Sequence, residues 1–148
     1  MSDSDWSFTD SDEVRFADLD SQGHLNNVVF LVFFESARVA YVRSVAPEYD
    51  PGSAGGLGFM VVEAKITYRS PGRYGERIDT RLRPTTVGRS SFRCEFEMRV
   101  GERVLADGYA VMVTYDHVAA TSIPVPDLLR ERLLADGAQQ RSGPAPGA

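Results

Sequence analysis

The sequence has few of the residues that build covalent cross-links and metal sites. Its single cysteine, Cys94, excludes an intramolecular disulfide, which fits the reducing cytoplasm. Its two histidines, His24 and His117, are too few for a metal site built on histidine. We therefore expect a cytoplasmic protein without a histidine-based metal site.

Long apolar runs and an excess of positive charge are also absent. The longest purely apolar run covers residues 28–34, whereas a membrane-spanning helix needs about 20 such residues. No basic segment followed by an apolar one opens the chain, so we expect no secretory signal. The net charge of −5 argues against a nucleic-acid binder. These absences predict a soluble protein with no nucleic-acid or membrane partner.

The chain of 148 residues is long enough for one domain with a substantial core. The first residues are acidic and rich in serine, and the last are small and rich in proline. Such segments bury too little apolar surface to fold. We therefore expect a flexible N-terminus over residues 1–12, a folded domain over 13–136 and a disordered tail over 137–148.

The folded domain is expected to open with a short strand and a long helix. Val14 and Phe16 share one face of a strand over residues 13–17, and a polar loop follows. Asn26 or Asn27 then caps a helix that runs over residues 28–45.

The first half of this helix is apolar on all sides, which predicts that other structure wraps around it. Further along, Glu35 and Arg38 lie one turn apart and are expected to form an ion pair. A structural hydrogen bond and a place in the active site are the alternatives for Glu35.

Four long strands are expected in the rest of the domain. Apolar and polar residues alternate strictly over 59–68 and 91–100, and more weakly over 78–86. Residues 104–115 are apolar on both faces near their end, which is typical of a central strand. Short turns between these segments favour antiparallel pairing. Leucines at helical spacing predict a short helix over 126–134.

A long antiparallel sheet with one apolar face needs a cover, and only the early helix is long enough to supply it. The sequence therefore predicts an α+β fold in which the sheet curls around a central apolar helix.

One segment carries a family resemblance. Residues 18–27 read DLDSQGHLNN between the strand and the helix, and the segments FESAR at 34–38, YRSP at 68–71 and GRSS at 88–91 add to the pattern. Together they resemble hotdog-fold acyl-CoA thioesterases of the 4-hydroxybenzoyl-CoA thioesterase type, over residues 13–115. The resemblance implies a hotdog fold and a homodimer or dimer-based homotetramer, with active sites between subunits.

The resemblance also implies residue roles. Asp20 matches the catalytic carboxylate, which acts as nucleophile or general base. The backbone amide that polarises the thioester carbonyl falls at or near Asn27.

The residue chemistry agrees with these roles. Thioester hydrolysis needs a base or nucleophile, a donor for the developing oxyanion and a slot for the acyl group. Asp20 can supply the first and the helix N-terminus the second. Phe30, Phe33 and Phe34 are expected to line the acyl slot, and Gly23 to let the backbone approach the ligand.

Arginines near strand ends, namely Arg69, Arg73 and Arg89, are candidates for the coenzyme's phosphates, with plain surface charge as the alternative. Ser90 and Ser91 are expected to contact the pantetheine arm. The predicted catalytic residues are Asp20, His24 and Asn27, and the predicted substrate-binding residues are Gly23, Asn26, Phe30, Phe34, Arg69, Arg89, Ser90 and Ser91.

Other interpretations of these residues stay open. Asp18 and Asp20 are common turn formers, and we expect Asp18 to fix the loop. His24 orients the substrate or Asp20, or hydrogen-bonds the loop. Glu63 adds a second carboxylate in a neighbouring subunit, or is solvated or part of an interface.

The expected function is hydrolysis of an acyl-CoA to free acid and CoA, without a metal or cofactor. A thioesterase acting on acyl-carrier-protein substrates is the alternative within the same class. A non-catalytic acyl-thioester binding protein is the alternative from another class. A hydratase is disfavoured because no second Asp-His pair occurs in a later strand–helix segment.

Overall fold

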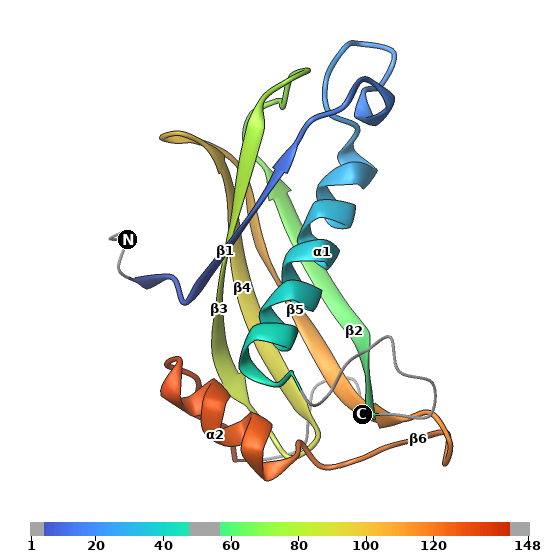
Figure 1. Ribbon diagram of the computed structural model, residues 1–148, viewed down its shortest axis with the longest axis vertical. Coiled ribbons are helices and arrows are strands. Elements are labelled where there is room, and N and C mark those ends of the chain that lie inside the picture. Colours follow the sequence, from blue (N-terminus) through green and yellow to red (C-terminus); the bar gives the residue numbers. More distant parts are fainter. Residues whose placement is uncertain (1–4, 48–56, 143–148) are drawn as a thin grey trace.

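The computed structural model describes residues 5–47 and 57–142, which form one sheet packed against one long helix (Figure 1). The strand order across the sheet is β1-β3-β4-β5-β2, and neighbours on this path are antiparallel. The strands on this path are β1 (Phe8–Glu13), β2 (Leu57–Tyr68), β3 (Arg77–Val87), β4 (Ser91–Val100) and β5 (Arg103–Asp116), of which the last four are long. Two short strands, β6 (Thr121–Ser122) and β7 (Gln139–Gln140), pair with β5 and β3.

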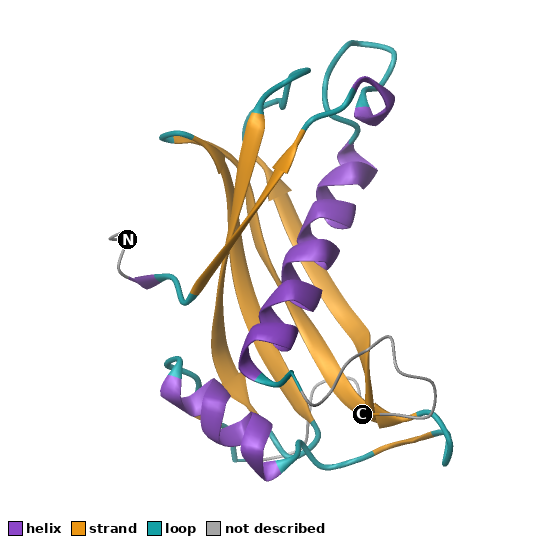
Figure 2. Ribbon diagram, viewed as in Figure 1, coloured by secondary structure: helices purple, strands orange, loops and turns teal. Residues whose placement is uncertain are grey.

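The long helix α1 (Asn27–Val45) lies along one face of the sheet, and the short helix α2 (Asp127–Ala135) lies at one end of it (Figure 2). A turn of 3₁₀ helix, η2 (Phe16–Asp18), precedes α1. No helix in the described ranges combines the length and hydropathy needed to cross a membrane. The predicted hotdog fold is confirmed, because a long antiparallel sheet curls along one central helix.

The sequence patterns explain these elements. The Asn26 side chain accepts a hydrogen bond from the Val28 N–H at 3.0 Å, so α1 begins where the capping signal predicts. Residues at alternate positions of β4 are buried, as the period of two requires. At the centre of the core, the Phe34 ring of α1 stacks on Phe96 of β4 with 3.9 Å between centroids. Cys94 lies in this buried row, and burial raises the pKa of its thiol to about 12.

The first strand is not where the sequence predicted it. We expected a strand at 13–17, but β1 covers Phe8–Glu13, and all of it except Glu13 lies in the segment expected to be flexible. Its sequence, FTDSDE, is polar because β1 is an edge strand with half-exposed side chains, so no apolar alternation marked it. Val14 is buried, but Phe16 belongs to η2 and is 78% exposed. At the other end, β7 lies within the segment expected to be a disordered tail.

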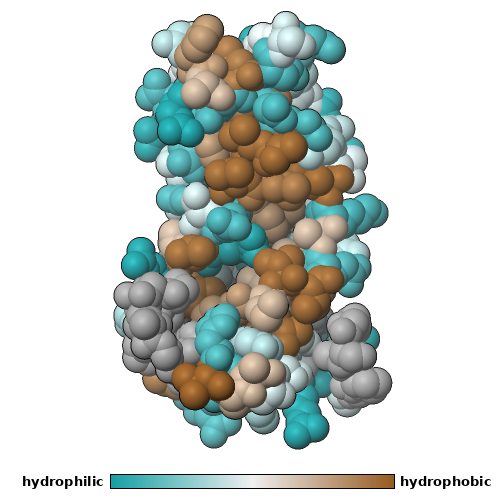
Figure 3. All heavy atoms as spheres, turned by 90° about the vertical axis from the view of Figure 1, so that its right-hand side faces the viewer, coloured by the Kyte–Doolittle hydropathy of each residue, from teal (hydrophilic) through white to brown (hydrophobic). Residues whose placement is uncertain are grey.

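Helix α1 is also less enclosed than predicted. Several apolar side chains on one side of it are exposed, and the neighbouring edge strand β2 exposes apolar side chains too (Figure 3). A bulge between Val61 and Glu63 interrupts the alternation that predicted one buried face for β2. We call this surface the α1–β2 flank; it comprises Val28, Leu31, Val32, Val39, Met60, Val61 and Val62.

The expected ion pair between Glu35 and Arg38 is not among the ion pairs of the described residues. Instead, the Arg38 guanidinium lies 4.8 Å from the centroid of the Phe34 ring. Burial lowers the pKa of Arg38, and the charge of Glu35 opposes that shift. The two charges therefore interact electrostatically without direct contact.

Candidate active site

The polar loop that precedes α1 is tied to the connection between β2 and β3 at one end of the sheet. The Leu25 N–H donates to the Gly72 carbonyl at 2.7 Å, and the Gly75 N–H donates to the Val14 carbonyl at 2.9 Å. A further backbone bridge joins His24 to Arg73. These bonds hold residues 19–26 beside residues 69–76, at the top of Figure 1.

Asp18 anchors this loop from inside. Its side chain is buried and accepts hydrogen bonds from the Arg15 backbone N–H at 2.9 Å and from the Arg15 guanidinium at 2.9 and 3.2 Å. The hydrogen bonds from Arg15 hold the pKa of this carboxyl below its usual range, against the opposing effect of burial. The Asp18 carbonyl also accepts the Asn26 N–H at 2.9 Å. This geometry supports a loop-fixing role for Asp18.

Asp20 lies on the outside of the same loop. Its Oδ1 accepts the N–H groups of Gln22 at 2.8 Å and His24 at 3.1 Å. Gly23 closes the turn at a φ of 77°, a conformation that strains any residue with a Cβ. Within the described part of the chain, Oδ2 of Asp20 receives no hydrogen bond. One oxygen thus fixes the loop, and the other is free for chemistry.

The first turn of α1 supplies a free donor. Asn26 satisfies two N–H groups, because its side chain accepts from Val28 and its carbonyl accepts from Val29 at 2.9 Å. The Asn27 N–H has no acceptor among residues 5–47 and 57–142. Because N–H groups at a helix start carry the positive end of the helix dipole, this amide suits a developing negative charge.

These groups surround one open hollow, which we call the mouth hollow. Five of the predicted residues line it, namely Asp20, His24, Asn27, Phe30 and Arg69. Leu25, Tyr68, Ser70 and Pro71 complete the lining.

Tyr68 is a lining residue whose role the sequence did not predict. Its hydroxyl donates to the Asn27 carbonyl at 2.9 Å, and its ring meets Phe30 edge-on with 5.2 Å between centroids. The segment YRSP at 68–71 was part of the family pattern, but only Arg69 in it was given a binding role. The signal for Tyr68 was therefore present in the sequence.

Several predicted residues do not reach the mouth hollow. Phe34 is fully buried against the sheet, so within one chain it belongs to the core and does not line an acyl slot. Arg89, Ser90 and Ser91 lie at the β3–β4 turn, at the opposite end of the sheet. The Arg89 carbonyl there accepts the Val125 N–H at 2.8 Å.

Arg69 lines the hollow, but its guanidinium already pairs with Asp107 of β5. Its charge is therefore partly neutralised before any phosphate arrives.

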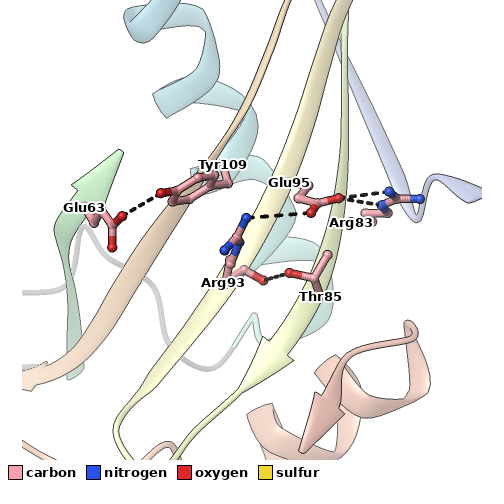
Figure 4. Close-up of polar contacts among 6 residues, drawn as sticks. All are labelled: Glu63, Arg83, Thr85, Arg93, Glu95 and Tyr109. Atoms are coloured by element: carbon pink, nitrogen blue, oxygen red, sulfur yellow. Dashed lines mark hydrogen bonds and ion pairs between the residues drawn. The ribbon is translucent and has the colours of Figure 1, made fainter. Parts of the chain in front are cut away.

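Glu63 points away from the mouth hollow, on the sheet face opposite α1 (Figure 4). It accepts the Tyr109 hydroxyl at 2.6 Å, and the Arg93 guanidinium lies 3.7 Å from the centroid of the Tyr109 ring. Glu95 in turn pairs with Arg93 at 3.9 Å and with Arg83 at 2.9 Å. Because these charges satisfy one another, this face has the character of a polar outer surface.

The described residues contain no group of three or more His, Cys, Asp or Glu side chains arranged to hold a metal ion. The two histidines lie apart, since His24 is in the mouth hollow and the ring of His117 packs against Tyr115 at the end of β5.

Several known proteins are similar to this chain in fold and in sequence. Residues 14–133 match the thioesterase-like superfamily. A 1,4-dihydroxy-2-naphthoyl-CoA hydrolase of Synechococcus elongatus is 23% identical over 122 residues, which are 81% of this chain and 90% of that protein. A Thermus thermophilus thioesterase, solved with coenzyme A and zinc, is 31% identical with a TM-score of 0.77 over 88% of this chain and 93% of that one. A thioesterase-superfamily structure from Jannaschia is 26% identical with a TM-score of 0.82, covering 92% of this chain and 87% of that one.

These matches confirm the predicted enzyme class, thioester hydrolase, at the level of the family. They do not single out the 4-hydroxybenzoyl-CoA type within it. Because the match spans most of the sequence and the architecture agrees, the chain belongs to the thioesterase-like superfamily.

Proposed function

We propose that this chain is a cytoplasmic acyl-CoA thioesterase in which Asp20 is the catalytic carboxylate and the Asn27 amide polarises the thioester carbonyl. One observation carries the proposal: a carboxylate oxygen and a helix N-terminal N–H, neither with a partner in the described residues, border the same hollow. The naming of a relative as a CoA-thioester hydrolase supports CoA as the thiol carrier.

Two routes fit this arrangement. In the first, Oδ2 of Asp20 attacks the carbonyl carbon, the thiolate leaves with the C–S bond's electron pair, and water hydrolyses the resulting mixed anhydride. In the second, Oδ2 removes a proton from water, whose oxygen adds to the same carbon before the thiolate leaves. In both routes the Asn27 N–H stabilises the oxyanion, an interaction worth about a hundredfold or more in rate.

His24 and Asn26 hold the groups of this site in place, His24 through its backbone N–H and Asn26 through its side chain. The His24 N–H holds Oδ1 of Asp20, and Asn26 fixes the first turn of α1 so that the Asn27 N–H faces outward. The imidazole of His24 lines the hollow and is free to contact the substrate.

An apolar groove between α1 and β2 offers a place for the acyl group. It lies along the middle and C-terminal half of the helix and is lined by Glu35, Arg38, Val39, Val42, Phe59, Val61 and Met112. Phe30 lines the mouth hollow and precedes Glu35 in α1, so an acyl chain that passes Phe30 would follow the helix towards this groove. The groove lies within the α1–β2 flank, so a second subunit on that flank would enclose it.

We propose that the active unit is a homodimer or a dimer-based tetramer formed through this flank. An open edge strand and an exposed apolar helix side both favour association. Arg89, Ser90 and Ser91 lie at the opposite end of the sheet from the mouth hollow of their own chain. In such an assembly they would contact only substrate bound in the mouth hollow of a neighbouring subunit. The 4-hydroxybenzoyl-CoA type remains our proposal for the subtype.

The direct test measures free-thiol release from a panel of short, long and aromatic acyl-CoAs. We expect turnover by the wild type and a loss of at least about a hundredfold in kcat for Asp20→Asn. The amide of Asn keeps one oxygen for the Gln22 and His24 N–H groups, so the loop is preserved while the charge is lost.

Glu131→Gln on α2 is the matched control, because it removes an exposed carboxylate far from the hollow. Equal turnover by the wild type and Asp20→Asn would remove Asp20 from the mechanism. Turnover of acyl-carrier-protein thioesters alone would favour the alternative substrate, and no turnover of either would favour a binding protein.

A further inference from the structure

Two exposed aromatic rings stand together beside the mouth hollow. Phe16 of η2 and Tyr74 of the β2–β3 connection are 78% and 66% exposed, and their rings meet edge-on with 6.2 Å between centroids. They come from loops far apart in sequence that the structure brings into contact. Two large rings in contact form a contiguous exposed apolar surface, and such a surface is a feature of ligand-binding sites.

The position of the pair connects it to the active site. Pro71 lines the mouth hollow, and three residues later the same connection presents Tyr74. Phe16 belongs to η2, which the side chain of Asp18 anchors. Asp18 is itself two residues before Asp20. The pair therefore stands on the rim of the same two loops that carry the catalytic groups.

An unpaired cation accompanies the rings. Arg73 is exposed, and its guanidinium forms no hydrogen bond or ion pair with any described residue. Three other arginines nearby are engaged, since Arg15 pairs with Asp18, Arg69 with Asp107 and Arg103 with Glu76. Arg73 is also tied to the site, because its backbone bridges that of His24. It is the arginine at this rim best placed to receive an anion.

We propose that Phe16, Tyr74 and Arg73 form the subsite for the nucleotide end of coenzyme A. The adenine ring stacks on the aromatic pair, and the Arg73 guanidinium binds a phosphate group. The proposal rests on the proposed function, since it places the pantetheine arm between this rim and the thioester at Asp20. It also assigns coenzyme A, and not a carrier protein, as the thiol carrier.

The chemistry of the three residues fits this occupant. A purine presents a flat face that stacks on an aromatic ring whatever its substituents. A guanidinium binds phosphate oxygens through charge-assisted, often bidentate, hydrogen bonds. Few other ligands of a thioesterase combine a flat aromatic base with phosphates at a distance from the reacting carbonyl.

The first experiment measures binding of adenosine 3′,5′-bisphosphate, the nucleotide part of coenzyme A, by calorimetry. We expect the wild type to bind it and Phe16→Ala and Tyr74→Ala each to weaken binding about tenfold. Arg73→Gln should weaken binding and reduce its dependence on salt. Val118→Ala is the matched control, because Val118 is equally exposed but lies beyond the end of β5.

The second experiment compares kcat/KM for one acyl group on coenzyme A and on pantetheine. We expect the wild type to prefer the CoA ester and the aromatic variants to reduce that preference about tenfold, through KM. A loss shared equally by both esters would indicate a structural role and overturn the proposal, as would failure of the wild type to bind the bisphosphate.

The same variants are also assayed with the acyl group on acyl-carrier protein, and a loss confined to that ester would overturn the proposal in favour of a protein-docking surface. Because the binding measurement needs no turnover, bisphosphate binding by an inactive wild type would reject the proposed function and leave the nucleotide subsite standing.

Discussion

At the scale of single residues, one hydrogen bond joins the end of β2 to the first turn of α1. The Tyr68 hydroxyl donates to the Asn27 carbonyl, on the peptide unit next to the proposed oxyanion donor. We expect Tyr68→Phe to lower the free energy of unfolding by about 1 kcal/mol and to reduce kcat several-fold, because the amide is less firmly placed.

Urea unfolding and thiol release measure the two effects. Tyr115→Phe is the control, since the structure shows a ring contact for Tyr115 but no hydrogen bond from its hydroxyl to any residue in 5–47 or 57–142. A kcat equal to that of the wild type would show that Tyr68 does not position the amide.

Asp18 makes stability depend on pH in a defined direction. Hydrogen bonds from Arg15 lower the pKa of Asp18 in the folded state, so its stabilising effect is complete above the ordinary value of about 4. It is lost as the pH falls through the lowered value. We expect Asp18→Asn to be less stable than the wild type at pH 6 and to lose less stability between pH 5 and pH 2.

Urea unfolding across that range tests this, with Asp127→Asn on α2 as an exposed carboxylate for comparison. Parallel pH profiles for the wild type and Asp18→Asn would contradict the assignment.

At the scale of elements, the start of α1 depends on one side chain. Asn26 caps the helix, so Asn26→Ala should cost about 1 kcal/mol in the free energy of unfolding, whereas Asn26→Asp keeps an acceptor and should cost much less. Thermal unfolding of the two variants measures this. Equal losses of unfolding free energy in both variants would mean that the shape of the Asn26 side chain, and not its capping hydrogen bond, stabilises the start of α1.

The sequence predicted the elements that have a strong period. Helix α1, helix α2 and the four long strands were expected within about two residues of their observed bounds, because capping residues, leucine spacing and alternation mark them. Strand β1 was missed because it is held by backbone pairing with β3 and its half-exposed side chains are mostly polar, so its sequence shows no apolar alternation. The exposed side of α1 was missed because a uniformly apolar helix carries no sign of which side is covered.

The sequence predicted those parts of the candidate site whose residues are close together along the chain. Asp20, His24 and Asn27 are close in sequence, so the motif alone brings them together. Contacts between distant segments could not be read in this way. The pairing of Arg69 with Asp107, and the distance of Ser91 from the hollow, depend on strand register.

At the scale of the whole molecule, the α1–β2 flank predicts self-association. We expect the wild type to be at least dimeric at micromolar concentration, and Val32→Lys combined with Val62→Lys to shift it towards monomer, because charged side chains block an apolar face and an open strand edge. Light scattering gives the mass directly.

Val118→Lys is the matched control, since Val118 is 78% exposed and lies outside the flank. A wild type that is monomeric at this concentration would contradict the association and the shared groove together.

The order of the elements along the chain also determines when helix α1 can be buried during synthesis. Helix α1 is complete when the ribosome has passed Val45, but β3, the first inner strand to reach its buried face, ends only at Val87. At ordinary translation rates this interval lasts roughly two to eight seconds. For that time a helix rich in phenylalanine and valine has no inner strand to pack against, so its apolar side chains can be buried only late, after most of the first 87 residues have been made.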